Sequence, residues 1–372
     1  MTAPPSPESI GLSWRTAGES HGPAMLGFLE GLPAGLPLDF AAVEAGLVRR
    51  WKGPGRGPRS KFEQDALEWV SGLKKGITLG TPLSILVRNS DTKIDTLPDL
   101  KAPRPGHADL PGVIRHQVRD VRAVLERASA RETVARTALG EVARQLLAAF
   151  GIQVQSQVIS IKGVTLESSW EEIIQEALDD GESLGGTFQV IANGLPPGLG
   201  GYAQATDRLD ARLMGALASI PAIKGVEIGQ GFAASETVGS AFHDEVCVDS
   251  TAYHSLGRVT NHAGGVEGGL TNGQQVLLRA AMKPIPTLRK GVPSVDLETG
   301  KLARSTYERS DVCAVFAAAV VGEALVSLEL ASALRARLGG TTLREMQQRF
   351  ETLNPGASVT DWPQNLGSSG FS

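Results

Sequence analysis

The 372-residue chain is 41% hydrophobic and 20% charged, a composition typical of a folded globular protein and not of a disordered one. Its net charge of −4 and aromatic content of 5% argue against a broad nucleic-acid or membrane-binding surface, so an anion site must come from a local group of arginines. The two cysteines, Cys247 and Cys313, form no CxxC pair, which excludes the common zinc and thioredoxin-like motifs and favours a reducing compartment.

The first third of the chain predicts short strands and one helix joined by glycine- and proline-rich loops. The first eight residues have neither a basic start nor an apolar segment, so they predict no secretory signal. Apolar residues at helical spacing predict a helix over 40–51. Strands are expected at 12–15, 24–29 and 85–87, a flexible basic loop at 52–59, and a long polar loop at 89–111.

Residues 119–150 predict the clearest helix, with an interruption at 129–133. Arg131 follows Ala128 by three residues and therefore falls within the apolar stripe. A charge on a buried stripe needs a partner. That partner is either Glu132 or another nearby acid, or a bound anion; we favour the anion because the neighbouring residues are small and hydroxylated.

The second half of the chain predicts further strands and two more helices. Strands are expected at 152–162, 187–192, 226–228 and 276–282, a helix at 209–217, and a glycine- and asparagine-rich stretch at 255–275. The apolar segment 312–338 contains Glu323 and Glu329, which are costly in a bilayer, so it predicts a buried core helix and no membrane span. Because no linker divides the chain, we expect one domain over 1–372 with a loose tail at 358–372.

Four segments place titratable or charged residues among small ones: GESHG at 18–22, RPGHAD at 104–109, RASARET at 127–133 and RSDVC at 309–313. His21 and His107 could give or take a proton near neutral pH. His262 is expected instead to shape a backbone site. Asp311 could act as a base, or it could simply cap the following helix.

Many arginines lie in or near these segments. Guanidinium groups bind carboxylate and phosphate with two hydrogen bonds, so a convergent set would suit a small, highly anionic substrate. For Arg49 and Arg59, a solvated basic surface remains the alternative. The arginines concerned are Arg49, Arg50, Arg56, Arg59, Arg104, Arg127, Arg131 and Arg309.

Glycine-rich segments offer two competing cofactor sites. Residues 264–269 could let a planar cofactor lie against the backbone, and 283–287 add a cation and a hydroxyl for a phosphate; glycines needed only for turns are an equal alternative. Residues 229–234 imitate a dinucleotide-binding GxGxxA motif, but the sequence after them is a poor helix. An NAD(P)-dependent oxidoreductase and a non-catalytic anion-binding module therefore stay as alternative functions.

Taken together, GESHG, RPGHAD, SARET, NHAGG and RxDxC, in this order from about Gly11 to Leu338, resemble the chorismate synthase family. Ala128 and Ser310 depart from the common serine and histidine of that family. The resemblance implies an α+β fold, a β-α-β sandwich with long small-residue helices between antiparallel sheets, and a homotetramer. It implies a lyase that converts 5-enolpyruvylshikimate 3-phosphate to chorismate in the shikimate pathway of aromatic amino acid biosynthesis, using reduced FMN without net redox change.

The resemblance also implies roles for individual residues. His21, aided by Ser20, would protonate the flavin region, His107 would protonate or hold the departing phosphate, and Asp311 would assist proton removal. Substrate anions would bind Arg50, Arg56, Arg104 and Arg131, of which Arg50 and Arg56 are described in some members as an NADP site. FMN contacts are implied for Arg127, Ala128, Ser129, Ala241, Phe242, Gly268, Lys283, Pro284, Ile285, Pro286, Thr287 and Arg309. We expect externally reduced FMN, a cytoplasmic location, and no metal, nucleic-acid or membrane partner.

Overall fold

The computed structural model describes residues 11–57, 65–308, 310–353, 359 and 362. Its helices are α1 Phe40–Trp51, α2 Asp109–His116, α3 Arg122–Ala128, α4 Thr133–Ala148, α5 Trp170–Asp179, α6 Leu209–Ala218, α7 Gly239–Phe242, α8 Val315–Leu338 and α9 Leu343–Glu351. Its main strands are β1 Ser13–Ala17, β2 Ala24–Glu30, β4 Leu67–Ser71, β7 Leu83–Arg88, β8 Gln153–Ile161, β9 Gly186–Asn193, β10 Ile223–Ile228 and β15 Val276–Met282.

Shorter strands complete the structure. They are β3 Ala34–Pro37, β5 Leu73–Lys74, β6 Ile77–Leu79, β11 Val246–Val248, β12 Leu256–Arg258, β13 Val266–Glu267, β14 Leu270–Thr271, β16 Pro293–Val295 and β17 Leu302–Arg304. Among them, β3, β6 and β5 form a three-stranded sheet, and β11–β12, β13–β14 and β16–β17 each pair as two strands.

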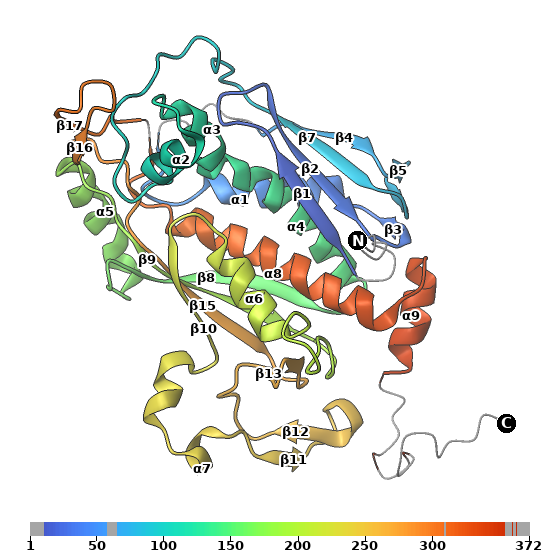
Figure 1. Ribbon diagram of the computed structural model, residues 1–372. Helices are drawn as coiled ribbons and strands as arrows, with labels where there is room; N and C mark the ends of the chain where they lie inside the picture. The colour runs from blue at the N-terminus through green and yellow to red at the C-terminus, as the bar shows by residue number, and fades with distance from the viewer. Residues whose placement is uncertain (1–10, 58–64, 309, 354–358, 360–361, 363–372) are drawn as a thin grey trace.

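Two four-stranded antiparallel sheets enclose a layer of helices (Figure 1). The first sheet has the order β1-β2-β7-β4, and the second has the order β10-β15-β9-β8. Helix α4 packs against β2 and β7 of the first sheet, and α8 packs against β8 and β9 of the second, while α4 and α8 also pack on each other. The α+β fold and the β-α-β sandwich are therefore confirmed.

The central helix pair is closely packed. A Cβ atom at Gly140 of α4 would clash with the Cβ of Ala324 on α8, so a glycine is needed where the two helices meet. Helix α8 is apolar on all sides. By length and composition it could cross a membrane, but 89% of its most apolar window is buried within the protein. The expectation of a buried core helix agrees with this packing.

The structure sets the boundaries of the predicted helices. The expected helix 119–150 is found as α3, a 3₁₀ turn at Ala130–Glu132 and α4, so the predicted interruption is present. The last long helix begins at Val315 and not at residue 312.

The imitation of a dinucleotide motif has a structural explanation. Gly229 has φ +58°, and a Cβ there would clash with the His262 carbonyl oxygen, because two backbone segments cross at this point. A 3₁₀ helix at Gly231–Glu236 follows instead of an α-helix, and the sheet that contains β10 is antiparallel. Both features differ from a dinucleotide-binding unit.

Candidate active site

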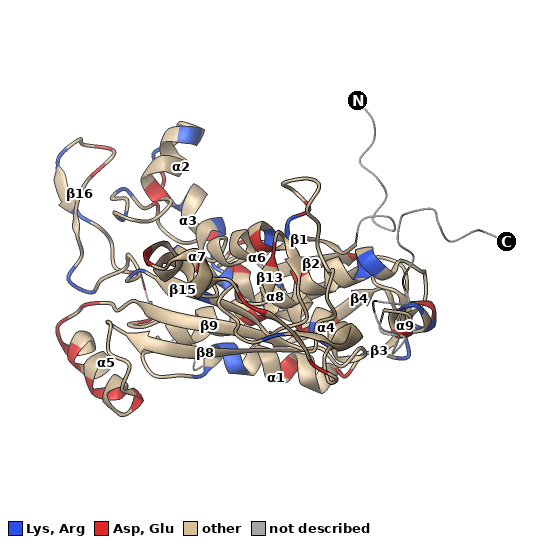
Figure 2. Cartoon of the chain, turned by 90° about the horizontal axis from the view of Figure 1, so that it is seen from below, with Lys and Arg blue, Asp and Glu red and all other residues tan. Residues whose placement is uncertain are grey.

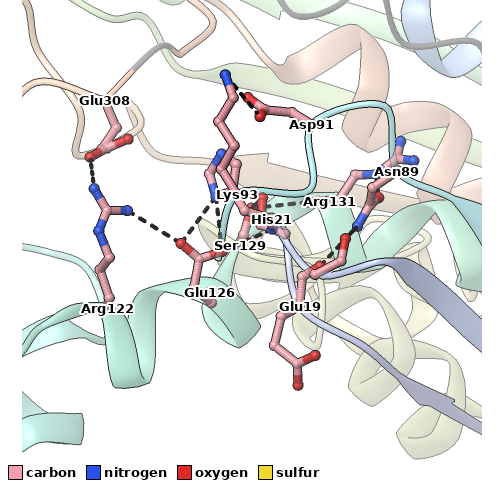
Figure 3. Close-up of polar contacts among 12 residues, drawn as sticks. Glu19, His21, Asn89, Asp91, Lys93, Arg122, Glu126, Ser129, Arg131 and Glu308 are labelled. Carbon is pink, nitrogen blue, oxygen red and sulfur yellow. Dashed lines mark hydrogen bonds and ion pairs between the residues drawn. The ribbon is translucent and has the colours of Figure 1, made fainter. Parts of the chain in front are cut away.

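The GESHG loop connects β1 and β2 and is held by Glu126 of α3 (Figure 3). The Ser20 N–H donates to the Glu126 carbonyl oxygen at 2.9 Å. The His21 backbone N–H donates to Glu126 Oε2 at 2.9 Å, and His21 Nδ1 lies 2.9 Å from the same oxygen. One glutamate therefore fixes both the backbone and the ring of His21.

Glu126 is ionised in this setting. Burial raises the pKa of this carboxyl, but hydrogen bonds from the His21 ring and backbone outweigh burial, and the pKa lies below its usual range. Arg122 adds a cation at 3.3 Å, and its other nitrogen reaches Glu308 at 3.3 Å. An ionised carboxylate at Nδ1 favours the tautomer that carries its proton there, which leaves Nε2 of His21 to face a substrate.

His107 has a similar arrangement in the RPGHAD segment. Its Nδ1 is in close contact with Oδ1 of Asp109, which has no exposed surface. Arg104 Nε donates to Asp109 Oδ2 at 2.8 Å. Burial raises the pKa of Asp109, but the bonds from His107 and Arg104 hold it well below its usual range. Both candidate histidines thus have Nδ1 on a buried carboxylate.

Arg104 also joins the His107 segment to the end of β15. Its Nη1 donates to Thr287 Oγ1 at 3.0 Å, and Lys283 Nζ donates to the Gly106 carbonyl oxygen at 3.0 Å. Burial and the nearby Lys224 lower the pKa of Lys283. Lys283 and Thr287, the cation and the hydroxyl expected in segment 283–287, therefore lie against the segment that carries His107.

Asp311 is held by the glycine-rich loop after α1. It forms a close ion pair with Arg56, and its Oδ1 accepts the Gly57 N–H at 2.7 Å. Helix α8 starts after Ala314 without a side-chain cap, so the interpretation of Asp311 as a helix cap is wrong. Burial raises the pKa of the neighbouring Cys313 thiol to about 11, so this cysteine is not a nucleophile at neutral pH.

Three arginines surround the indole of Trp51. The guanidinium carbon lies 4.5 Å from the ring centroid for Arg50 and 5.8 Å for both Arg56 and Arg131. Within the described part of the chain, three buried donors in this group have no hydrogen-bond partner: Arg50 Nε, Trp51 Nε1 and Arg56 Nε. Unsatisfied buried donors beside several cations suit a bound anion.

A cavity of about 390 Å³ borders part of the site. Arg56, Asp311 and Thr287, the hydrogen-bond partner of Arg104, line it, whereas His21, His107, Arg50 and Arg131 are not among its lining residues. Helix α5, on whose ribbon Figure 2 marks acidic residues, contributes Glu171 to the wall. Residues more than 200 positions apart in the sequence thus border one space of a size usual for small-molecule sites.

Comparisons with known proteins identify the family. The sequence matches the family model described as chorismate synthase over residues 12–334. The chain belongs to the chorismate synthase family. It is 43% identical to a chorismate synthase from Solibacter usitatus, with 92% of this chain and 98% of the relative covered.

Other comparisons agree on the chorismate synthase family. A chorismate synthase from Geobacter sulfurreducens is also 43% identical, covering 91% of this chain and 98% of that protein. A crystal structure of chorismate synthase superposes with a TM-score of 0.76 and 37% identity, covering 94% of this chain and 99% of that chain. The resemblance inferred from the five motifs is thereby confirmed.

Part of the flavin set that the chorismate synthase resemblance implies lies beside His21. Arg127 donates to the carbonyl oxygens of Gly18 and Thr16 at 3.1 and 3.0 Å, and Ser129 Oγ donates to Ser20 Oγ at 3.2 Å. Ala128 ends α3 between them.

Three members of the implied flavin set lie in other parts of the fold, and a fourth lies outside the described residues. Ala241 and Phe242 are in α7, which Figure 1 draws far from α3, and Gly268 joins β13 to β14. The His262 ring nitrogen Nδ1 lies 2.8 Å from the Phe242 carbonyl oxygen, in agreement with the backbone role expected for this histidine. Arg309, like Arg59, lies outside the described residues.

Two arginines have acidic partners in the structure. Arg131 pairs closely with Asp65, so a nearby acid is one partner, as the alternative interpretation expected, while contact of Arg131 with a bound anion stays a prediction. Arg49 lies at the surface, with a 41% exposed side chain, but its charge is paired, because it donates to both carboxylate oxygens of the buried Glu323, at 2.7 and 2.8 Å. Arg49 therefore anchors the end of α1 and does not line the site.

Sequence reasoning missed the acids that orient the site. Glu126 and Asp65 lie outside the four segments that place titratable residues among small ones. Only the need of Arg131 for a partner pointed toward a residue such as Asp65. Asp109 lies within the RPGHAD motif, but no local pattern assigns it a role. Among the described residues, no group of three or more potential ligands could hold a metal ion.

Proposed function

We propose that this chain catalyses the 1,4-elimination of phosphate from 5-enolpyruvylshikimate 3-phosphate, giving chorismate and inorganic phosphate. The observation that carries this proposal is the grouping of two carboxylate-oriented histidines, an arginine cluster and the Arg56–Asp311 pair. The family match over residues 12–334, and the similarity to a relative over 92% of the chain, support the same reaction. The enzyme is a carbon–oxygen lyase acting on a phosphate ester.

The arginines would hold the anionic groups of the substrate, which carries two carboxylates and a phosphate. Arg50 is 4% exposed, and burial lowers its pKa to about 10, so the group is still protonated at neutral pH. Charged donors in a buried site bind oxyanions more strongly than they do in water. We assign Arg50, Arg56 and Arg131 to the substrate anions, with Arg104 beside the phosphate.

Proton movement would involve three side chains. Elimination breaks the C–O bond to phosphate and a ring C–H bond, so the phosphate needs a proton or cation and the ring hydrogen needs an acceptor. We propose that Nε2 of His107 protonates or holds the departing phosphate. His21, aided by Ser20, would protonate the flavin region. Asp311 would assist removal of the ring proton once the substrate competes for Arg56.

Reduced FMN fits part of the site. Lys283, Thr287, Arg127 and Ser129 supply cations and hydroxyls near the two histidines, and the 390 Å³ cavity borders Thr287. When bound, the reduced flavin would supply the electron density that eases departure of the phosphate. We keep Ala128, Pro284, Ile285, Pro286 and Arg309 in this group. Ala241 and Phe242 of α7, and Gly268 between β13 and β14, stay in the flavin set only as the family resemblance implies.

Several further features belong to the proposal. We propose that the chain acts as one domain, because one continuous apolar core includes residues from both large sheets. The proposed assembly is a homotetramer in the cytoplasm that receives flavin reduced by another system. No nucleic acid or membrane takes part.

The proposal is tested by an anaerobic assay with 5-enolpyruvylshikimate 3-phosphate and photoreduced FMN, followed by chorismate absorbance and phosphate release. We expect equal amounts of both products and no net oxidation of the flavin. Binding of the substrate without turnover would support the anion-binding module instead. Turnover with NADPH and no flavin would support the oxidoreductase.

A further inference from the structure

Asp65 lies between two arginines of the proposed substrate site. It is 5% exposed and comes just before β4. Its Oδ2 accepts from Arg50 Nη2 at 3.1 Å, and its Oδ1 is in close contact with Arg131 Nη1. Each carboxylate oxygen therefore holds one guanidinium group.

The arginine cluster needs such a counter-charge. Arg50, Arg56 and Arg131 all lie within 5.8 Å of the Trp51 ring centroid, so three cations share one small, buried space. The charges of Arg131 and Arg56 both lower the pKa of Arg50, and such repulsion is strong away from bulk water. Among the residues that the structure describes, Asp311 pairs with Arg56, and Asp65 pairs with both Arg50 and Arg131.

The contacts of Asp65 continue to the His21 loop. Arg131 Nε donates to Asn89 Oδ1 at 2.7 Å. The Asn89 amide then donates to the carbonyl oxygens of Glu19 and Gly22, at 3.0 and 2.7 Å, on both sides of His21 (Figure 3). The direction of Arg131 is therefore tied to the loop that carries the proposed proton donor.

We propose that Asp65 is a positioning residue that fixes Arg50 and Arg131 in the directions that the substrate requires and limits the positive charge of the empty site. This inference rests on the proposed function. It makes an unusual prediction: removing the charge of Asp65 lowers turnover while it strengthens the binding of a simple anion. A residue that only stabilised the fold would not strengthen anion binding.

Asp65→Asn is the variant that separates these effects. Asp65 has φ +43°, a left-handed conformation that asparagine also tolerates, so the backbone is retained and only the charge is lost. Glu68→Gln is the matched control. It removes one negative charge three residues from Asp65, on a side chain that is 46% exposed. Asp65→Glu keeps the charge but displaces the carboxylate by one methylene group.

The experiment measures two quantities on the full chain: kcat in the anaerobic assay, and the Kd of inorganic phosphate by calorimetry, with circular dichroism as the check of folding. For Asp65→Asn we expect kcat about tenfold lower or more, because the arginines lose their orientation, and a phosphate Kd about three- to tenfold lower, because the site gains net positive charge. Asp65→Glu is expected to lower kcat with the phosphate Kd unchanged. Glu68→Gln is expected to change neither.

Unchanged kcat in Asp65→Asn, or a phosphate Kd that stays equal or rises in the folded variant, overturns the inference. If Asp65→Asn does not fold, Asp65→Glu decides: a kcat equal to that of the unmodified chain overturns the positioning role. A failure of the proposed function is distinguishable, since then the unmodified chain itself would form no chorismate.

Discussion

His21 Nδ1 lies 2.9 Å from Oε2 of Glu126, and the same oxygen accepts the backbone N–H of His21. The imidazole can therefore neither rotate nor exchange tautomers without breaking contacts to a buried, ionised carboxylate. His107 and Asp109 repeat this relationship on a different loop. In both pairs the acid orients the histidine through Nδ1, and Nε2 of His107 lies 3.4 Å from Arg104 Nη2.

Replacing Glu126 by glutamine tests the orientation of His21. The glutamine amide has no charge, and its one oxygen would have to accept from both the backbone N–H and the ring Nδ1–H of His21. We therefore expect kcat to fall about 10- to 100-fold. Nitrogen NMR of the His21 ring is expected to show a mixture of tautomers in place of one. Glu172→Gln on the exposed face of α5 is the control. A variant with full activity and a single Nδ1–H tautomer would contradict the role given to Glu126.

Acid should destabilise the protein through Asp109. Its folded pKa lies below the usual value of 3.8, so its ion pairs stabilise the folded state above that value, and this stabilisation is lost as the pH falls toward the lowered pKa. We expect the free energy of unfolding in urea to fall between about pH 5 and pH 3 in the unmodified chain. The fall should be shallower in Asp109→Asn, and equal slopes in the two proteins would refute the assignment.

Asp311 should matter for turnover more than for stability. It is held by Arg56 and by one backbone N–H, with its side chain 21% exposed, outside the apolar core. We expect Asp311→Asn to lower kcat about 100-fold with a melting temperature within a few degrees of the unmodified chain. Ser310→Ala, next to it, is the control for disturbance of the loop. Retention of kcat in Asp311→Asn would remove Asp311 from the mechanism.

The two helix glycines Gly140 and Gly215 should respond in opposite ways to alanine. A methyl group at Gly140 meets Ala324 across the α4–α8 contact, so Gly140→Ala should destabilise the protein by about 1–3 kcal/mol. A methyl group at Gly215 of α6 meets nothing within 4 Å, so Gly215→Ala should stabilise it by about 0.5–1 kcal/mol. Urea unfolding measures both changes, and the same sign for both would contradict the helix packing described above.

Local patterns in the sequence were enough to predict much of the fold. The apolar periodicity of α1 and α4, the interruption before Thr133 and the buried nature of α8 all follow from the spacing of neighbouring residues. The start of α8 was placed three residues early, because Asp311 looks like a helix cap in sequence but binds Arg56 in space.

The partners of the site residues could not be predicted in this way. Asp65 meets Arg131 and Glu126 meets His21 across 66 and 105 positions of sequence, and no local pattern encodes such separations. The same limit explains Arg49, whose neighbours in the basic loop suggested an anion site, whereas in the structure it pairs with Glu323 of α8. Motifs located the reacting groups, and tertiary packing selected the acids that orient them.

A crystal structure of the protein with 5-enolpyruvylshikimate 3-phosphate and FMN bound tests the central claim most directly. The account predicts that Arg56, Arg131 and His107 lie within hydrogen-bond distance of the anionic groups of one substrate molecule, with Asp311 beside its ring. A substrate bound away from the Trp51 cluster, or one that leaves His107 and Asp311 facing separate spaces, would contradict it.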